Sequence, residues 1–127
     1  MALQREYVDI ALYSKLPRDN ANLSVVVEAR KFREPTKVAF GQAATYAEQE
    51  GRGSCLRLIL TDGIKYYVYV RREKERFADK AVAYLNLTRL VDDYPLLHLA
   101  GAIDALALMA PDWSDYHPPI TTQSQEL

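Results

Sequence analysis

The sequence predicts an α/β domain in which helices flank a mixed β-sheet. Two stretches, residues 23–32 and 55–72, are rich in β-branched and aromatic residues in runs of strand length. Between them, residues 35–50 have an alanine-rich helical composition. An amphipathic stretch near the end of the chain completes the order strand, strand, helix, strand, strand, helix.

The first two strands are expected on either side of a turn. In EYVDIALY, residues 6–13, apolar Val8, Ile10 and Leu12 alternate with a second face, as they do in a half-buried strand. The second face carries Tyr7, Asp9, Ala11 and Tyr13. The following SKLPRDNAN has the proline, aspartate and asparagine residues of a turn. LSVVVEARKF, residues 23–32, then predicts the second strand.

A helix and a hairpin follow. Pro35 suits a first helical turn, and Gly51 and Gly53 suit the end of a helix, so we expect a helix over residues 35–50. Residues 55–72 read as two strands joined by Asp62-Gly63. This dipeptide is typical of a type I′ turn, in which both central residues have positive φ.

The remaining third of the chain is less regular. REKERFADK predicts a charged connector. Cations in it and just before it could also touch phosphates, namely Arg71, Arg72, Lys74 and Arg76. The next stretch, AYLNLTRLV, fits either a strand or a helix. YPLLHLAGAIDALALMA predicts an amphipathic helix, with Leu99, Ile103, Leu106 and Ala110 at helical spacing. We expect one domain over residues 1–110 and a flexible, proline-containing tail over residues 111–127.

Composition and charge bound the class of protein. The chain has 127 residues, of which 49% are hydrophobic and 26% charged, which is enough for one globular core. The single cysteine, Cys55, lies in an apolar stretch and is expected to be a buried thiol. With no secretory signal and no membrane-spanning run, the expected location is the cytoplasm. Residues 1–76 carry a net charge of +4 and residues 77–127 one of −5, so a basic face on the first half is allowed.

Ionised side chains stand at the end of an apolar strand. In SVVVEARKF, Glu28 and Arg30 project to one face of the strand, and Lys31 to the other. If the preceding strand is a neighbour, Asp9 and Glu28 can converge, and two carboxylates suit Mg²⁺ that also binds a substrate phosphate. A lone glutamate at a strand end is more often a rim residue or a salt-bridge partner than a metal ligand.

Several stretches in order resemble a known family. YVDIALY, VVVEARKF, GQAATYAEQEG and LILTDGIKYYVYVR are similar to the nuclease domain at the start of the R subunits of type I restriction enzymes, within the PD-(D/E)XK nuclease superfamily. The resemblance implies that Asp9 and Glu28 bind the divalent metal and that Arg30 occupies the position of the catalytic lysine. It also implies that Gln42 and Tyr46 form the Gln-x-x-x-Tyr element of the helix, and their i, i+4 spacing puts them on one face.

The resemblance implies a restriction-endonuclease-like fold and a DNA endonuclease dependent on Mg²⁺ or Mn²⁺. The implied partner is DNA, without a membrane, with the chain acting as a homodimer or in a larger restriction-type assembly. One residue departs from the pattern, because Arg30 stays protonated and cannot act as a general base. The alternative is therefore a catalytically inactive module of the same fold that binds DNA or serves assembly.

Overall fold

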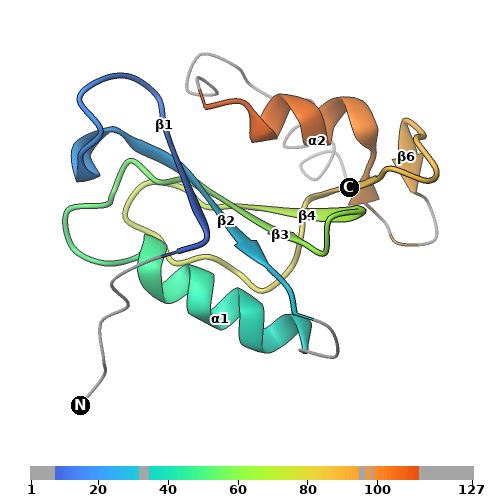
Figure 1. The fold of residues 1–127 in the computed structure, drawn as a ribbon, viewed down its shortest axis with the longest axis horizontal. Coiled ribbons are helices and arrows are strands. Elements are labelled where there is room, and N and C mark those ends of the chain that lie inside the picture. The colour runs from blue at the N-terminus through green and yellow to red at the C-terminus, as the bar shows by residue number, and fades with distance from the viewer. Residues whose placement is uncertain (1–7, 32–34, 95–96, 98, 112–127) are drawn as a thin grey trace.

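A computed structural model describes residues 8–31, 35–94, 97 and 99–111. These residues form a seven-stranded mixed sheet with one helix on each face (Figure 1), which confirms the α/β class. The first two residues of the expected opening strand and residues 112–127 of the expected tail lie outside the described residues. The strands are β1 (Ile10–Tyr13), β2 (Leu23–Ala29), β3 (Arg57–Thr61), β4 (Lys65–Val70), β5 (Ala83–Asn86), β6 (Asp93–Tyr94) and β7 (Leu99–Ala100). The helices are α1 (Thr36–Ala47), α2 (Ala102–Met109) and a short 3₁₀ turn, η1 (Asn20–Asn22).

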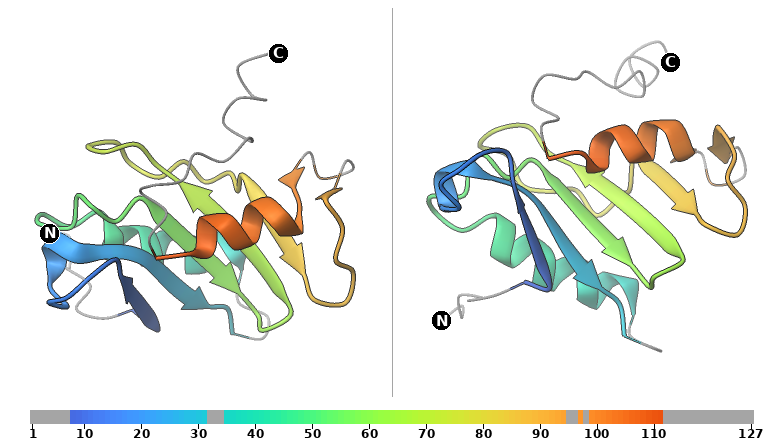
Figure 2. Two further views of the ribbon diagram at one scale, coloured as in Figure 1. Left: turned by 90° about the horizontal axis from the view of Figure 1, so that it is seen from above. Right: turned by 45° about the horizontal axis from the view of Figure 1, so that its top comes forward.

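The strand order across the sheet is β1-β2-β3-β4-β5-β7-β6. The second and third strands in this order, β2 and β3, are parallel, so the chain must cross back between them, and α1 makes this crossover. β1 pairs antiparallel with the other edge of β2, and β3, β4 and β5 form an antiparallel series. Figure 2 shows α2 lying over one face of the sheet and α1 under the other.

Each face of the sheet has its own apolar core. Strand alternation sends Val26 of β2 toward α1, and Val25 and Val27 toward α2. On the α1 face these residues pack with Leu58, Leu60, Tyr69, Phe77 and the buried alanines of α1. On the α2 face they pack with Ile59, Val68, Leu85 and Leu108. The expected run of valines in β2 is thus buried on both faces.

The prediction that Val8, Ile10 and Leu12 form one apolar face of the first strand is wrong in part. Leu12 packs in the α2-side core, whereas Val8 lies against the α1-side core and Ile10 is half exposed. β1 is short and stands at the edge of the sheet, so α2 covers only its later residues. Alternation holds within β1, where Ala11 and Tyr13 face the α1 side and Leu12 the α2 side, but Val8 precedes the strand and does not follow it.

The hairpin between β3 and β4 is where the sequence predicts it, but the turn type is wrong. Thr61 pairs with Tyr66, so the two central residues are Gly63 and Ile64. Gly63 has φ +96°. Lys74 is the one non-glycine residue with positive φ in the part of the chain that the structure describes, so the φ of Ile64 is negative. A single positive φ at a first central glycine is typical of a type II′ turn. Asp62 shifts the turn by one residue, because its Oδ1 accepts hydrogen bonds from the backbone N–H groups of Ile64 and Lys65.

The last helix begins later than predicted. Leu99 belongs to β7, and α2 starts only at Ala102. The N–H groups of Gly101 and Ala102 donate to the carbonyls of Asp92 and Val91, and a Cβ on Gly101 would lie 2.3 Å from Val91 O. This close approach of two backbone segments needs glycine and breaks the helical pattern.

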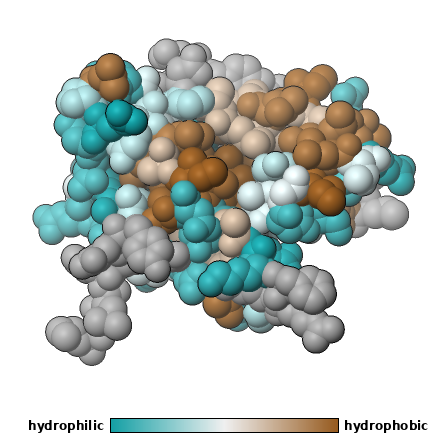
Figure 3. Space-filling model, viewed as in Figure 1, coloured by the Kyte–Doolittle hydropathy of each residue, from teal (hydrophilic) through white to brown (hydrophobic). Residues whose placement is uncertain are grey.

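The buried face of α2 also differs from the prediction. Ala105 and Leu108 are buried, whereas Ile103 is 64% and Leu106 57% exposed. Apolar side chains are visible on the surface around α2 (Figure 3). Neither helix among the described residues has the length and apolarity needed to cross a bilayer.

Candidate functional site

Glu28 lies at the carboxyl end of β2 and is buried, with 4% of its surface exposed. The register runs from Glu28 to Leu60 of β3 and from Leu60 to Tyr67 of β4. Because Leu60 and Tyr67 pack on the α1 side, Glu28 projects to that face too. A buried carboxylate costs several kcal/mol unless its surroundings compensate it, so its position identifies a candidate site.

Asp9 lies directly beside this position. β1 begins at Ile10, which pairs with Val27, so Asp9 directly precedes the strand at the end of the sheet where Glu28 lies. The Asp9 Oδ2 atom accepts a hydrogen bond of 2.7 Å from the backbone N–H of Ala29, the residue after Glu28. The two candidate metal ligands therefore lie at the same end of the sheet, Asp9 just before β1 and Glu28 near the end of β2.

Arg30 extends the same edge. Its N–H donates to Thr61 O at 2.7 Å, which continues the parallel pairing beyond β2. Its side chain is half-buried and lines a cavity of about 10 Å³. The other lining residues are Leu60, Thr61, Asp62, Lys65 and Tyr67. Since Leu60 and Tyr67 face α1, Glu28 and Arg30 share a face, as the alternation predicts.

The surroundings of this face are apolar and aromatic. Tyr69 of β4 packs against Phe40 of α1, with ring centroids 4.9 Å apart. Burial, with smaller effects from Tyr67 and Asp79, raises the pKa of Tyr69 to about 12, although the positive charge of Arg30 opposes the shift. The Tyr69 hydroxyl therefore stays protonated at neutral pH and can act only as a neutral group.

The other two predicted site residues, Gln42 and Tyr46, lie on α1 and not at the sheet edge that carries Glu28 and Arg30. Gln42 is exposed on α1, and Tyr46 is buried one turn later. The Arg52 guanidinium lies 3.8 Å from the centroid of the Tyr46 ring, and Arg52 Nε donates to Asn20, just before β2. Tyr46 is thus near the amino end of β2, whereas Glu28 lies near the carboxyl end of that strand, five residues after Leu23.

The donor set at this edge fits a magnesium ion bound in its common mode. Mg²⁺ takes one or two carboxylates and keeps several waters or phosphate oxygens, and Asp9 and Glu28 offer such a pair. Among the residues that the structure describes, no group of three or more His, Cys, Asp or Glu side chains could hold a metal. A site here would therefore be of the open, two-carboxylate kind.

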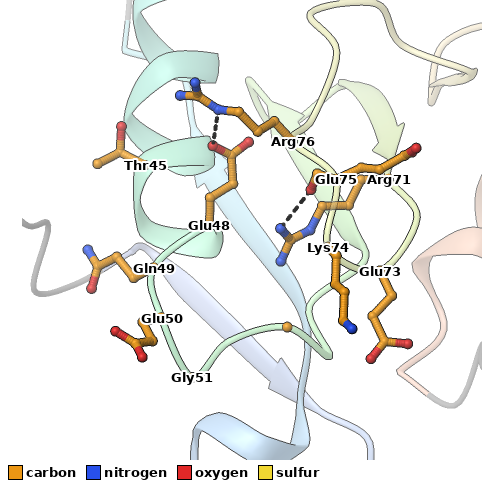
Figure 4. A pocket seen from close by; sticks show the side chains of 11 residues that line it. Thr45, Glu48, Gln49, Glu50, Gly51, Arg71, Glu73, Lys74, Glu75 and Arg76 are labelled. Carbon is orange, nitrogen blue, oxygen red and sulfur yellow. Dashed lines mark hydrogen bonds and ion pairs between the residues drawn. The ribbon is translucent and has the colours of Figure 1, made fainter.

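A much larger cavity lies elsewhere, at the carboxyl end of α1. Its volume is about 730 Å³, and Figure 4 shows it between the end of α1 and the connector that follows β4. Four glutamates line it, together with Arg71, Lys74 and Arg76. The Glu48 carboxylate is occupied, because it pairs with Arg76 Nε at 3.4 Å and accepts the Phe77 N–H at 2.8 Å. With four glutamates against three cations, the lining does not favour a phosphate-rich ligand.

Arg71, which lines this cavity, has a structural role. The side chain is 8% exposed, and its guanidinium donates to four backbone carbonyls, those of Ala47, Arg52, Cys55 and Glu75, at 2.8 to 3.1 Å. Arg71 therefore ties the end of α1 to the following loop and to the β4–β5 connector. The expectation that it could touch phosphates is wrong, because its donors face inward.

The fold and this edge define an α/β domain in which an interior strand, β2, carries a buried carboxylate near its end and a second carboxylate, from Asp9, contacts the next backbone N–H. No protein-family model, curated protein or solved structure matches the chain. Lys65 is a residue of this edge that the sequence pattern did not single out. The signal was its place two residues before Tyr67 in a predicted strand, which puts both on one face.

Proposed function

We propose that the chain is a DNA endonuclease of restriction-endonuclease-like fold that hydrolyses phosphodiesters with Mg²⁺ or Mn²⁺ at Asp9 and Glu28. The observation that carries the proposal is the contact of Asp9 with the backbone of Ala29, beside buried Glu28. This matches the order that the family resemblance implies, namely an aspartate strand, a glutamate strand and then a helix.

Each side chain has a part that follows from its chemistry. Asp9 and Glu28 would hold the metal, which when bound polarises the phosphodiester and activates water. Arg30 would stabilise negative charge on the phosphate, since a guanidinium stays charged and presents several donors. Gln42 and Tyr46 remain helix residues implied by the resemblance, and the apolar packing around Tyr69 would limit the access of bulk water.

A second candidate function rests on Arg30. If the reaction needs a lysine that can give up or relay a proton at this position, arginine cannot supply it. The chain would then be a catalytically inactive DNA-binding or assembly module that keeps the same fold. Such a module would bind DNA without a metal and with strong salt dependence.

Cleavage of supercoiled plasmid and of single-stranded DNA, with Mg²⁺ or Mn²⁺, separates the two. We expect the native chain to cut, Asp9→Ala to abolish cutting and Arg30→Lys to keep or raise it. The matched control is Asp19→Ala, an exposed aspartate in the turn at the opposite end of β1, which should leave cutting unchanged.

Each other result has a defined meaning. Cutting only by Arg30→Lys would support the inactive module with an intact metal site. If the native, Asp9→Ala and Arg30→Lys proteins all fail to cut DNA, the nuclease proposal is contradicted. Equal loss in Asp9→Ala and Asp19→Ala would point to general damage and remove the support for Asp9 as a ligand.

A further inference from the structure

Lys65 is the first residue of β4, and it stands on the same sheet face as the candidate site. Tyr67 packs toward α1, and Lys65 precedes it by two residues, so their side chains share that face. The residue pairs with Asn86 on β5 and is exposed. The ammonium group therefore stands at the solvent side of the edge that carries Glu28 and Arg30.

Arg30 and Lys65 line one small cavity. Its volume of about 10 Å³ is at the lower limit for one water-sized group, a size that a single phosphate oxygen matches and a base exceeds. Two cations and one carboxylate, Asp62, line it. The Asp62 Oδ1 atom is engaged with two N–H groups of the turn, and these hydrogen bonds lower its pKa. The lining keeps a net charge of +1 at neutral pH.

The start of α1 adds to the positive potential of this end. Figures 1 and 2 show the amino end of α1, the carboxyl end of β2 and the β3–β4 hairpin at the same end of the molecule. α1 has twelve residues, no side-chain cap at its start and no acidic residue in its first turn. The dipole of this helix therefore favours an anion nearby.

We propose that Arg30 and Lys65 together bind one phosphate of the DNA backbone beside the Asp9–Glu28 pair. Lys65 thereby supplies, from β4, the ammonium group that the strand pattern lacks at position 30. An ammonium is a compact point charge suited to a phosphate oxygen, and the guanidinium adds directed hydrogen bonds. This inference rests on the proposed function, since it names the part of the substrate that this end of the site holds.

Binding of a short fluorescein-labelled DNA duplex tests the inference without cleavage. Fluorescence anisotropy would be measured without divalent metal, over roughly 50 to 200 mM potassium chloride. We expect Lys65→Met to weaken binding about tenfold at low salt and to reduce the slope of log K against log salt by about one, the effect of one lost phosphate contact. Lys65→Arg should restore both values, and two unrelated duplexes should respond equally.

The control variant is Lys15→Met, which removes an exposed lysine from the turn at the opposite end of β1. Equal effects of Lys65→Met and Lys15→Met would overturn the inference, and so would the absence of DNA binding by the native chain. Binding that depends on Lys65 without any cleavage would contradict the nuclease proposal alone. The two proposals therefore fail in distinguishable ways.

Discussion

Glu28 combines burial with a position next to Asp9, and this makes its role testable apart from cleavage. We expect Glu28→Gln to abolish the heat of Mn²⁺ binding in titration calorimetry, because an amide of the same shape carries no charge for the metal. The thermal midpoint should not fall, since the amide removes a buried charge without leaving a cavity.

The matched control is Glu73→Gln, which changes an exposed glutamate of the β4–β5 connector in the same way. It should leave the titration heat of the native protein intact. If Glu28→Gln binds Mn²⁺ as the native chain does, Glu28 is not a metal ligand, whatever the cleavage assays give.

Arg71 is the second residue with a consequence that can be measured. We expect Arg71→Met to lower the free energy of unfolding by about 3 kcal/mol, because several buried carbonyls lose a charged donor at once. Urea denaturation would measure the change. Arg72→Met, at the exposed next position, should stay within about 0.5 kcal/mol of the native protein, and equal effects of the two would refute this role.

Single residues differ in how far sequence alone could place them. Cys55 is buried, as its apolar neighbours indicate. Arg57 and Arg71 are buried too, and nothing in their local sequence indicates it. Their partners are carbonyls far along the chain, such as Leu108 for Arg57, so tertiary structure alone decides their burial.

At the scale of elements, two glycines with opposite roles give a paired prediction. Gly63→Ala should destabilise the protein by about 1 kcal/mol, since φ +96° disfavours a side chain in the hairpin. Gly41→Ala should stabilise it by a similar amount, because Gly41 lies within α1 and a Cβ there meets nothing within 4 Å. Chemical denaturation of both variants would check the signs, and a shared sign would contradict the turn geometry or the helix.

The elements also show where prediction from sequence ends. The predicted helix 35–50 and the hairpin around Asp62 are present with small shifts, because caps, glycines and alternation are local signals. α2 was predicted too early and with the wrong face. Its true start depends on Gly101 lying against Val91 and Asp92, a contact that local periodicity does not contain.

At the scale of the whole molecule, buried acidic groups predict how stability varies with pH. Burial raises the pKa of Cys55 from 9.0 to about 11. Because the folded state keeps a proton that the unfolded chain releases, stability falls as pH rises from about 9 to about 11. Tyr69 extends the fall, since its pKa rises from 10.0 to about 12.

Urea denaturation at about pH 8 and about pH 10.5 would measure this dependence. We expect the native chain to lose about 2 kcal/mol from Cys55 over this interval, and Cys55→Ala to lose correspondingly less. Parallel pH curves for the two proteins would contradict the burial of the thiol.

The arrangement of the site was predictable in part. The order of aspartate strand, glutamate strand and helix follows from local patterns, and it suggests that Asp9 and Glu28 converge. The approach of Lys65 to Arg30 depends on the parallel pairing of β2 with β3 and on the hairpin register. These pairings are non-local, so sequence alone left Lys65 without a role.

The partners of Arg71 have a further consequence for tolerance of acid and salt. Its guanidinium is held by carbonyl dipoles, so acidification removes none of its acceptors, and arginine itself does not titrate. Buried hydrogen bonds to neutral dipoles are also poorly screened by added ions. In added salt, the junction of α1, its following loop and the β4–β5 connector should therefore outlast the Glu48–Arg76 pair, whose arginine is exposed to solvent and whose attraction is screened.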